Sequence, residues 1–164
     1  MAKLKDDPLS TYLIGEKVSK LDSRERFLGQ VDELQCHIML VRSLLDEDDE
    51  LREVFLTIAK KLQVLMGEIA GGKGKITLED IDYLIELKEK YEQNMGVVKE
   101  FVIPGQNRVS AEMHIARTIT RRCELQYAVV YTEHMQNKVI FEFLNKMSLM
   151  LYWMSVTYDH KNIK

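Results

Sequence analysis

Apolar residues in the first half of the chain recur at alternating spacings of four and three. One such stretch runs from Phe27 to Leu45, and a second runs from Leu51 to Ile69. This spacing places the apolar side chains on one face of an α-helix, whereas a half-buried strand would alternate every two residues. Each stretch therefore predicts an amphipathic helix of several turns, which has to bury its apolar face against other elements.

Breaks between helices are marked by proline and glycine, which are rare here. The two prolines are Pro8 and Pro104, and glycines cluster at 71–74 and at Gly105. The segments between these breaks predict three more helices, over 77–100, 108–133 and 136–158. No stretch shows sustained two-residue alternation, so we expect no sheet. The fold predicted for residues 1–164 is an all-α single domain, a five-helix up-and-down antiparallel bundle.

The composition gives no sign of nucleic-acid binding, secretion, a membrane span or a metal site. The net charge of −3 gives no general reason to expect nucleic acid. The N-terminus lacks the apolar core of a secretory signal, and the run 147–156 is about half of what a membrane span needs. Cys36 and Cys123 lack the spacing of a zinc site or a disulfide framework, and the histidines show no ligand spacing. We therefore expect a cytoplasmic protein with no membrane contact and no metal site of its own.

A polar stripe lies on the predicted helix 108–133. It consists of His114, Arg117, Arg121 and Glu124, at spacings of three, four and three. Arginine presents a planar fork of donors that suits phosphate oxygens, and a carboxylate can hold such a side chain in place. The spacing alone leaves two interpretations open. The stripe is either a ligand site for a polyphosphate, or a solvated or interface face with an Arg121–Glu124 pair.

Other polar residues lie near these elements. Arg122 is next to the stripe, and Asn145 lies on the predicted last helix. Asp32 is adjacent to the apolar face of the first helix rather than opposite it, which is a suitable place for the partner of an arginine. An isolated aspartate on a helix is more often only solvated.

Several segments, taken in chain order, resemble one known family. They are 15–20, 22–24 and 31–34 in the first third, 101–105, 114–118 and 121–124 in the middle, and 143–148 in the last helix. Together they resemble the ATP:cob(I)alamin adenosyltransferases of the propanediol-utilisation type, and the match spans nearly the whole chain. The middle segments, Phe-Val-Ile-Pro-Gly, then His-Ile-Ala-Arg-Thr and Arg-Arg-Cys-Glu, are the most specific.

The resemblance implies a five-helix bundle that forms a homotrimer with active sites between subunits. The reaction that it implies transfers the 5′-deoxyadenosyl group of ATP, bound with magnesium, to the cobalt of reduced cobalamin and releases triphosphate. Residues 1–20 would then be an N-terminal segment that forms part of the nucleotide site.

The resemblance also implies a role for most of the polar residues named above. Arg121, Glu124 and Asn145 would contact ATP, and Lys20 would lie near the phosphates. Arg122 would belong to the same ligand-binding group.

The remaining roles concern the corrinoid. Arg117 and Asp32 would pair across the subunit interface and shape the corrinoid side, and with Arg121 they are the expected catalytic residues. Phe101 would lie beneath the corrin and help to expel its lower ligand. His114 receives no role.

The chain departs from the family pattern mainly at the triphosphate end. The glycines of the N-terminal loop are replaced by Lys5–Thr11, where Ser10 and Thr11 are expected to keep part of the phosphate cradle. Leu125 and Gln126 replace two arginines, and Leu149 replaces an acidic residue. These departures leave an alternative, a non-catalytic corrinoid- or nucleotide-binding relative that kept the bundle. A purely structural helical oligomer is a third interpretation.

Overall fold

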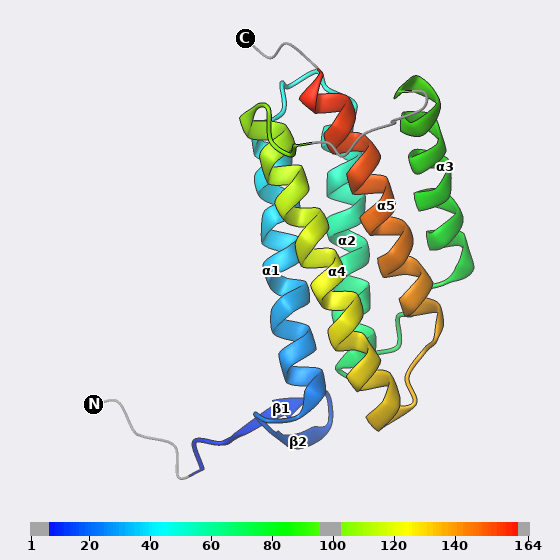
Figure 1. Cartoon of the computed structure of the whole chain (residues 1–164). Coiled ribbons are helices and arrows are strands. Elements are labelled where there is room, and N and C mark those ends of the chain that lie inside the picture. The colour runs from blue at the N-terminus through cyan, green and yellow to red at the C-terminus, as the bar shows by residue number, and fades with distance from the viewer. Residues whose placement is uncertain (1–6, 96–102, 161–164) are drawn as a thin grey trace.

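The computed structural model of the protein describes residues 7–95 and 103–160. Its helices run alternately up and down one bundle (Figure 1), which confirms the predicted all-α class. They are α1 (Ser23–Leu44), α2 (Leu51–Ile69), α3 (Leu78–Met95), α4 (Arg108–His134) and α5 (Val139–Asp159). The predicted third helix was longer, and its residues 96–100 lie outside the described part.

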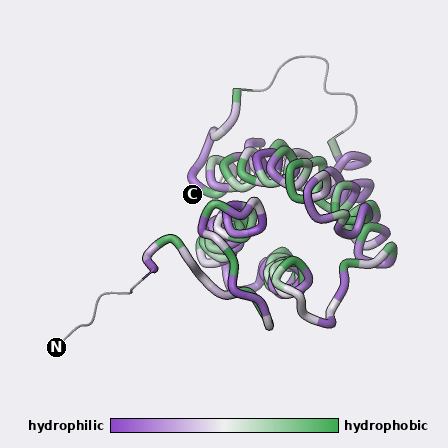
Figure 2. Tube along the Cα trace, turned by 90° about the horizontal axis from the view of Figure 1, so that it is seen from below, coloured by the Kyte–Doolittle hydropathy of each residue, from purple (hydrophilic) through white to green (hydrophobic). Residues whose placement is uncertain are grey.

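The order of the helices around the bundle follows from their contacts. The first helix, α1, packs against α2 and α4, and α5 packs against α4 and α3. Figure 2 looks along the helices and shows them gathered around one axis. All of them contribute to one apolar core, in which Phe27, Phe55, Phe143 and Tyr127 are among the largest fully buried side chains.

A small antiparallel hairpin precedes α1, so the prediction of no sheet is wrong for residues 10–19. Strand β1 (Ser10–Leu13) pairs with β2 (Glu16–Ser19), and Gly15 in the turn has a φ of +77°. Strands of four residues are too short to show a sustained alternation. The hairpin is attached to the bundle because the Ile14 N–H donates to the Ala70 carbonyl at the end of α2, at 2.9 Å.

Asp22 joins the hairpin to the start of α1 and to the end of α4. Its carboxylate accepts the Arg24 N–H at 2.9 Å as the N-cap of α1, and the Arg24 side chain bonds both Asp22 and Glu16. The Nε2 atom of His134 lies 3.4 Å from the same carboxylate. The hydrogen bond from Arg24 lowers the pKa of Asp22 to about 2.

This junction makes a testable contribution to acid stability. A folded-state pKa below the unfolded value stabilises the fold above the unfolded pKa, and the contribution disappears as the pH falls through the folded pKa. For Asp22 the window runs from the ordinary aspartate pKa of 3.8 down to about 2. Between about pH 5 and pH 2, the free energy of unfolding of the wild type should fall by about 2 kcal/mol more than that of Asp22→Asn. Urea unfolding at several pH values measures the difference, and parallel pH curves would contradict this assignment.

The ends of α4 are fixed by polar caps. Asn107 and Ser110 form a reciprocal capping box at its start, which agrees with the prediction that the helix begins near residue 108. At its end, Met135 adopts a left-handed conformation with a φ of 49°. Asn137 then accepts the Val139 N–H at 3.0 Å, so α5 begins three residues later than predicted.

Candidate active site

The polar stripe of α4 runs from the core to the surface. His114 is buried, Arg117 is half-buried, and Arg121 is exposed. Glu124 faces α5, where its Oε1 atom accepts a hydrogen bond from the Asn145 Nδ2 atom at 3.3 Å. The structure therefore brings Glu124 and Asn145 together, one helical turn from the exposed guanidinium of Arg121.

Arg117 lacks a partner within the described part of the chain. Its Nε atom is buried and makes no hydrogen bond there. Burial lowers the pKa of Arg117, and the positive charge of Arg121 lowers it further. Partial burial of a cation without a carboxylate nearby costs desolvation free energy. A negative group from outside the described fold would therefore bind favourably next to Arg117.

Asp32 is exposed on α1, and the fold does not bring it to Arg117. It lines a hollow between α1 and α2 together with Gly29, Met66 and Gly67. Arg117 instead lines a hollow on α4 with Pro104 and Gly105. The two side chains thus belong to different faces of the bundle, and their expected pairing across an interface stays a prediction.

Arg122 points away from the stripe. Its guanidinium forms an ion pair with Glu33 of α1 at 2.6 Å, and both side chains are about half exposed. Because Arg122 has a partner within the chain, the geometry separates it from Arg121 and Glu124. Its expected part in ligand binding is not tested by this arrangement.

The N-terminal candidates gather at the end of the bundle. Ser10 and Thr11 lie in β1, and the Ser10 hydroxyl donates to the Asp7 carbonyl at 3.2 Å. Lys20 follows β2 and is exposed, while its N–H donates to the Leu9 carbonyl at 2.7 Å. Phe101 lies outside the described residues.

The hairpin is distant from Arg121 within one chain. It is joined through Asp22 to His134 at the end of α4, and Arg121 lies thirteen residues earlier on that helix. At 1.5 Å per residue this is about 20 Å along the helix axis. The fold of one chain therefore does not assemble the nucleotide site that the resemblance implies.

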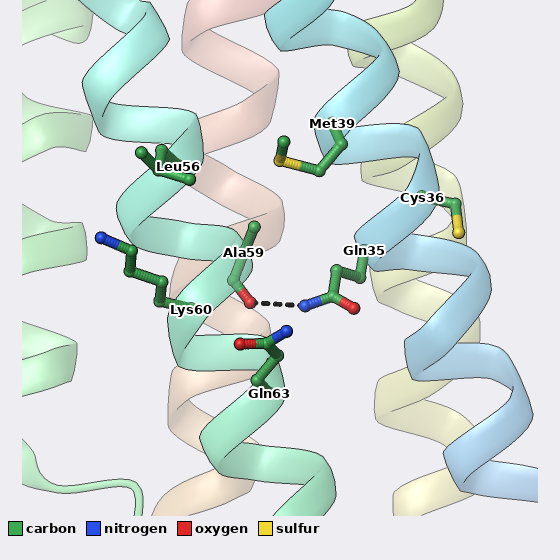
Figure 3. Close-up of a pocket in the computed structure, with 7 residues that line it drawn as sticks. All are labelled: Gln35, Cys36, Met39, Leu56, Ala59, Lys60 and Gln63. Carbon is green, nitrogen blue, oxygen red and sulfur yellow. Dashed lines mark hydrogen bonds between the residues drawn. The ribbon is translucent and has the colours of Figure 1, made fainter.

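A separate groove between α1 and α2 does not carry this chemistry. It has a volume of about 370 Å³ and is lined by Gln35, Cys36, Met39, Leu56, Ala59, Lys60 and Gln63. Figure 3 shows these side chains, with the Gln35 amide donating to the Ala59 carbonyl at 2.8 Å. Its lining contains no carboxylate and no arginine, so it does not resemble the stripe.

His114 is a buried residue whose contacts the sequence did not reveal. Its Nε2 atom lies 3.0 Å from the Asp159 carboxylate, and its Nδ1 atom lies 3.3 Å from the Ser155 hydroxyl. Both partners are more than forty residues away in the sequence. No spacing rule connects positions so far apart, so only the packing of α4 against α5 shows this contact.

The described residues contain neither a metal-binding cluster nor a helix that could cross a membrane. Within residues 7–95 and 103–160, no three His, Cys, Asp or Glu side chains gather as a metal site would require. None of the helices described there is long and apolar enough to cross a membrane.

Comparison with known proteins decides the family. Residues 2–158 match the family of cobalamin adenosyltransferases. The chain belongs to the cobalamin adenosyltransferase family. This membership confirms the resemblance found in the sequence, and with it the enzyme class, which is ATP-dependent adenosyl transfer to cobalamin.

Individual adenosyltransferases agree with this membership. The corrinoid adenosyltransferase of Citrobacter freundii is 36% identical over 126 residues, which are 73% of this chain and 71% of that protein. The corrinoid adenosyltransferase of Bacillus subtilis strain 168 is 28% identical over 149 residues, 87% of this chain and 77% of its own length.

A solved structure extends the similarity to the fold. A variant PduO-type ATP:corrinoid adenosyltransferase from Lactobacillus reuteri, complexed with cobalamin and ATP, superposes with a TM-score of 0.87 at 25% identity. The superposition covers 93% of this chain and 89% of that one.

Proposed function

We propose that this adenosyltransferase binds ATP and cob(I)alamin in a site formed between two copies of the chain, and that the chain assembles as a homotrimer. The observation that carries this proposal is the pair of unmatched charges on separate faces. Arg117 is a half-buried cation without a partner in the described fold, and Asp32 is an exposed carboxylate on another face. A second copy of the chain can supply a carboxylate to Arg117 and a cation to Asp32.

The heights of these residues along the bundle support such a contact. The Arg122–Glu33 ion pair places the middle of α4 level with the middle of α1. Asp32 is therefore within about one or two turns of Arg121 and Arg117 along the bundle axis. When the α1 face of one copy meets the α4 face of another, the opposite charges need no large shift along the axis to pair.

The nucleotide half of the site is built around Arg121. This exposed guanidinium would hold the triphosphate of ATP, whose negative charge increases at the leaving group as the bond to the 5′ carbon breaks. Glu124 and Asn145, already bonded to each other, would accept from and donate to the nucleoside. The hairpin of a neighbouring copy would bring Lys20, Ser10 and Thr11 to the phosphates.

Magnesium would accompany the ATP. Asp7, Ser10 and Thr11, at the start of the hairpin, carry side-chain oxygens of the hard type that this ion prefers. Because magnesium usually keeps several waters and binds through phosphates, a few protein oxygens are sufficient.

The corrinoid half lies beyond Arg117. Reduced cobalt is the nucleophile and belongs to the substrate, so the protein has to orient the corrinoid and the 5′ carbon of ATP toward each other. The Asp32–Arg117 pair would fix the two subunits at the corrinoid edge and exclude water from the reaction. Phe101 would lie under the ring, as the resemblance implies.

A reductive assay tests the proposed activity. Purified protein is incubated anaerobically with MgATP and cob(I)alamin, and the visible spectrum and a triphosphate assay follow the products. We expect adenosylcobalamin and triphosphate in equal amounts. The leucines at positions 9, 125 and 149 are exposed, and they stand where the family pattern has polar residues. This loss of polar groups favours the alternative of a binding protein that has lost turnover. Corrinoid binding without adenosylcobalamin would support that alternative and contradict the proposal.

We also propose that the protein is cytoplasmic. Cys36 and Cys123 are both free cysteines. A cytoplasmic location would keep them reduced, and burial raises the pKa of the Cys123 thiol to about 12, which makes it unreactive.

A further inference from the structure

A buried polar contact connects the end of α5 to the turn before α4. The Oδ2 atom of Asp159 bonds His114 on α4, while its Oδ1 atom accepts the backbone N–H groups of Gly105 and Gln106 at 3.2 and 2.9 Å. The Asp159 side chain is almost completely buried, at 1% exposure, and that of His114 is 7% exposed. One carboxylate thus holds a helix side chain and the backbone of a turn at the same time.

The turn held in this way is one wall of the hollow beside Arg117. Pro104 and Gly105 line this hollow of about 320 Å³ together with His114, Ile115 and Arg117. Gly105 has a φ of +87°, and a Cβ atom there would lie 3.1 Å from the Cβ of Ala111. The turn is therefore pressed against α4 on one side and anchored by Asp159 on the other.

The charge on Asp159 suits this anchoring role. Burial raises the pKa of Asp159, but hydrogen bonds from Ser110, from the Gln106 N–H and from His114 together outweigh it and leave the pKa below its usual value. The carboxylate is accordingly ionised near neutral pH, and charge-assisted hydrogen bonds to an ionised acceptor are the stronger kind.

We propose that His114 and Asp159 are positioning residues for the corrinoid, because they hold the Pro104–Gln106 turn as a wall of the hollow beside Arg117. The inference rests on the active site proposed above and adds two residues to it. The lining of the hollow includes Arg117 but not Arg121. Its lining is mostly apolar, with Pro104, Ala111 and Ile115, which suits the edge of a corrin ring better than phosphates. Cobalamin is much larger than the hollow, so only one edge enters.

Substitutions of the pair should separate the two substrates. His114→Phe keeps the ring volume but removes both hydrogen bonds, and Asp159→Ala removes the anchor of the turn. For each we expect the KM for cobalamin to rise about tenfold or more, while the KM for ATP changes by less than about twofold, because a displaced wall affects only the substrate that it contacts. The backbone amides of Gly105 and Gln106 should also exchange with solvent faster in both variants.

Conservative and matched variants make this test decisive. Asp159→Asn should retain near wild-type values, because the amide oxygen can still accept the two backbone N–H groups and the amide nitrogen can donate to the other tautomer of His114. His37→Phe is the matched control. His37 lies 3.5 Å from Glu112 between α1 and α4 and does not line the hollow, so its substitution should change neither KM nor the two amide exchange rates.

Each alternative outcome has a separate meaning. Equal rises in both KM values together with a lower melting temperature would show that the pair only supports the fold, and would overturn the inference. Unchanged exchange at Gly105 and Gln106 in His114→Phe would also overturn it, whatever the kinetics. If the wild type made no adenosylcobalamin, the proposed function would fail first, while the exchange measurement would still decide whether the pair holds the turn.

Discussion

Replacing Arg121 by alanine is expected to lower kcat/KM for ATP by about two to three orders of magnitude, with little effect on stability. Arg121 is exposed, and it forms no ion pair among the described residues, so its removal takes almost nothing from the fold. In the proposed site it faces the triphosphate, and loss of one group that stabilises developing charge typically costs a factor of about 10² to 10³. Steady-state kinetics with saturating cobalamin measure the first effect. Thermal unfolding measures the second, which should stay within about 0.5 kcal/mol.

Two companion variants show whether the effect is specific. Arg121→Lys keeps the charge but loses the planar fork, so it should fall between the wild type and Arg121→Ala. Arg108→Ala removes an equally exposed arginine from the first residue of the same helix and should leave the kinetics unchanged. A parallel loss of activity and melting temperature in Arg121→Ala would mean that this residue supports the fold and not the nucleotide.

Mixing two inactive variants is expected to restore activity if the site lies between subunits. Arg117→Ala and Asp32→Ala should each lose about a hundredfold or more, because each leaves the opposite charge unpaired at a desolvated contact. In a mixed oligomer, however, Asp32 from the first variant can meet Arg117 from the second. That interface is wild type on both sides. Co-expression with two different affinity tags and sequential purification isolates the mixed oligomers, whose activity per site is then measured.

The complementation experiment has an internal control. Arg117→Ala co-expressed with a chain that carries both substitutions cannot form an intact pair at any interface, so this mixture should stay inactive. Light scattering reports the oligomeric state of every preparation. A monomeric wild type, or mixed oligomers no more active than their parents, would argue against an intersubunit site.

The helices could be predicted because their determinants are local. Apolar spacing is visible within any window of a dozen residues, and Gly105 and Asn107 mark the start of α4 without reference to the rest of the chain. The hairpin was missed because two strands of four residues carry too little pattern. It is attached to the bundle by a long-range hydrogen bond, from the Ile14 N–H to the Ala70 carbonyl at the end of α2, that no local rule detects.

The polar stripe shows where local information ends. Its residues were visible as a group in the sequence, but their different surroundings were not. In the fold, Glu124 accepts a hydrogen bond from Asn145 on α5, and Arg122 forms an ion pair with Glu33 on α1. Arg121 is exposed to solvent. Neighbouring positions on a helix point about 100° apart, so which partner each one meets depends on how the helices are arranged around the bundle.

By itself, then, the sequence determined the helical class, most helix boundaries and the family, because periodicity and ordered motifs are properties of the linear chain. The tertiary structure alone decided that Arg117 and Asp32 lie on separate faces, and that His114 meets Asp159. The physical reason is that unpaired charge and burial are defined only by what surrounds a side chain in space. The polar stripe is thus visible in the sequence. Only the fold leaves Arg121 exposed, half-buries Arg117 without a partner among the described residues, and buries His114 against Asp159.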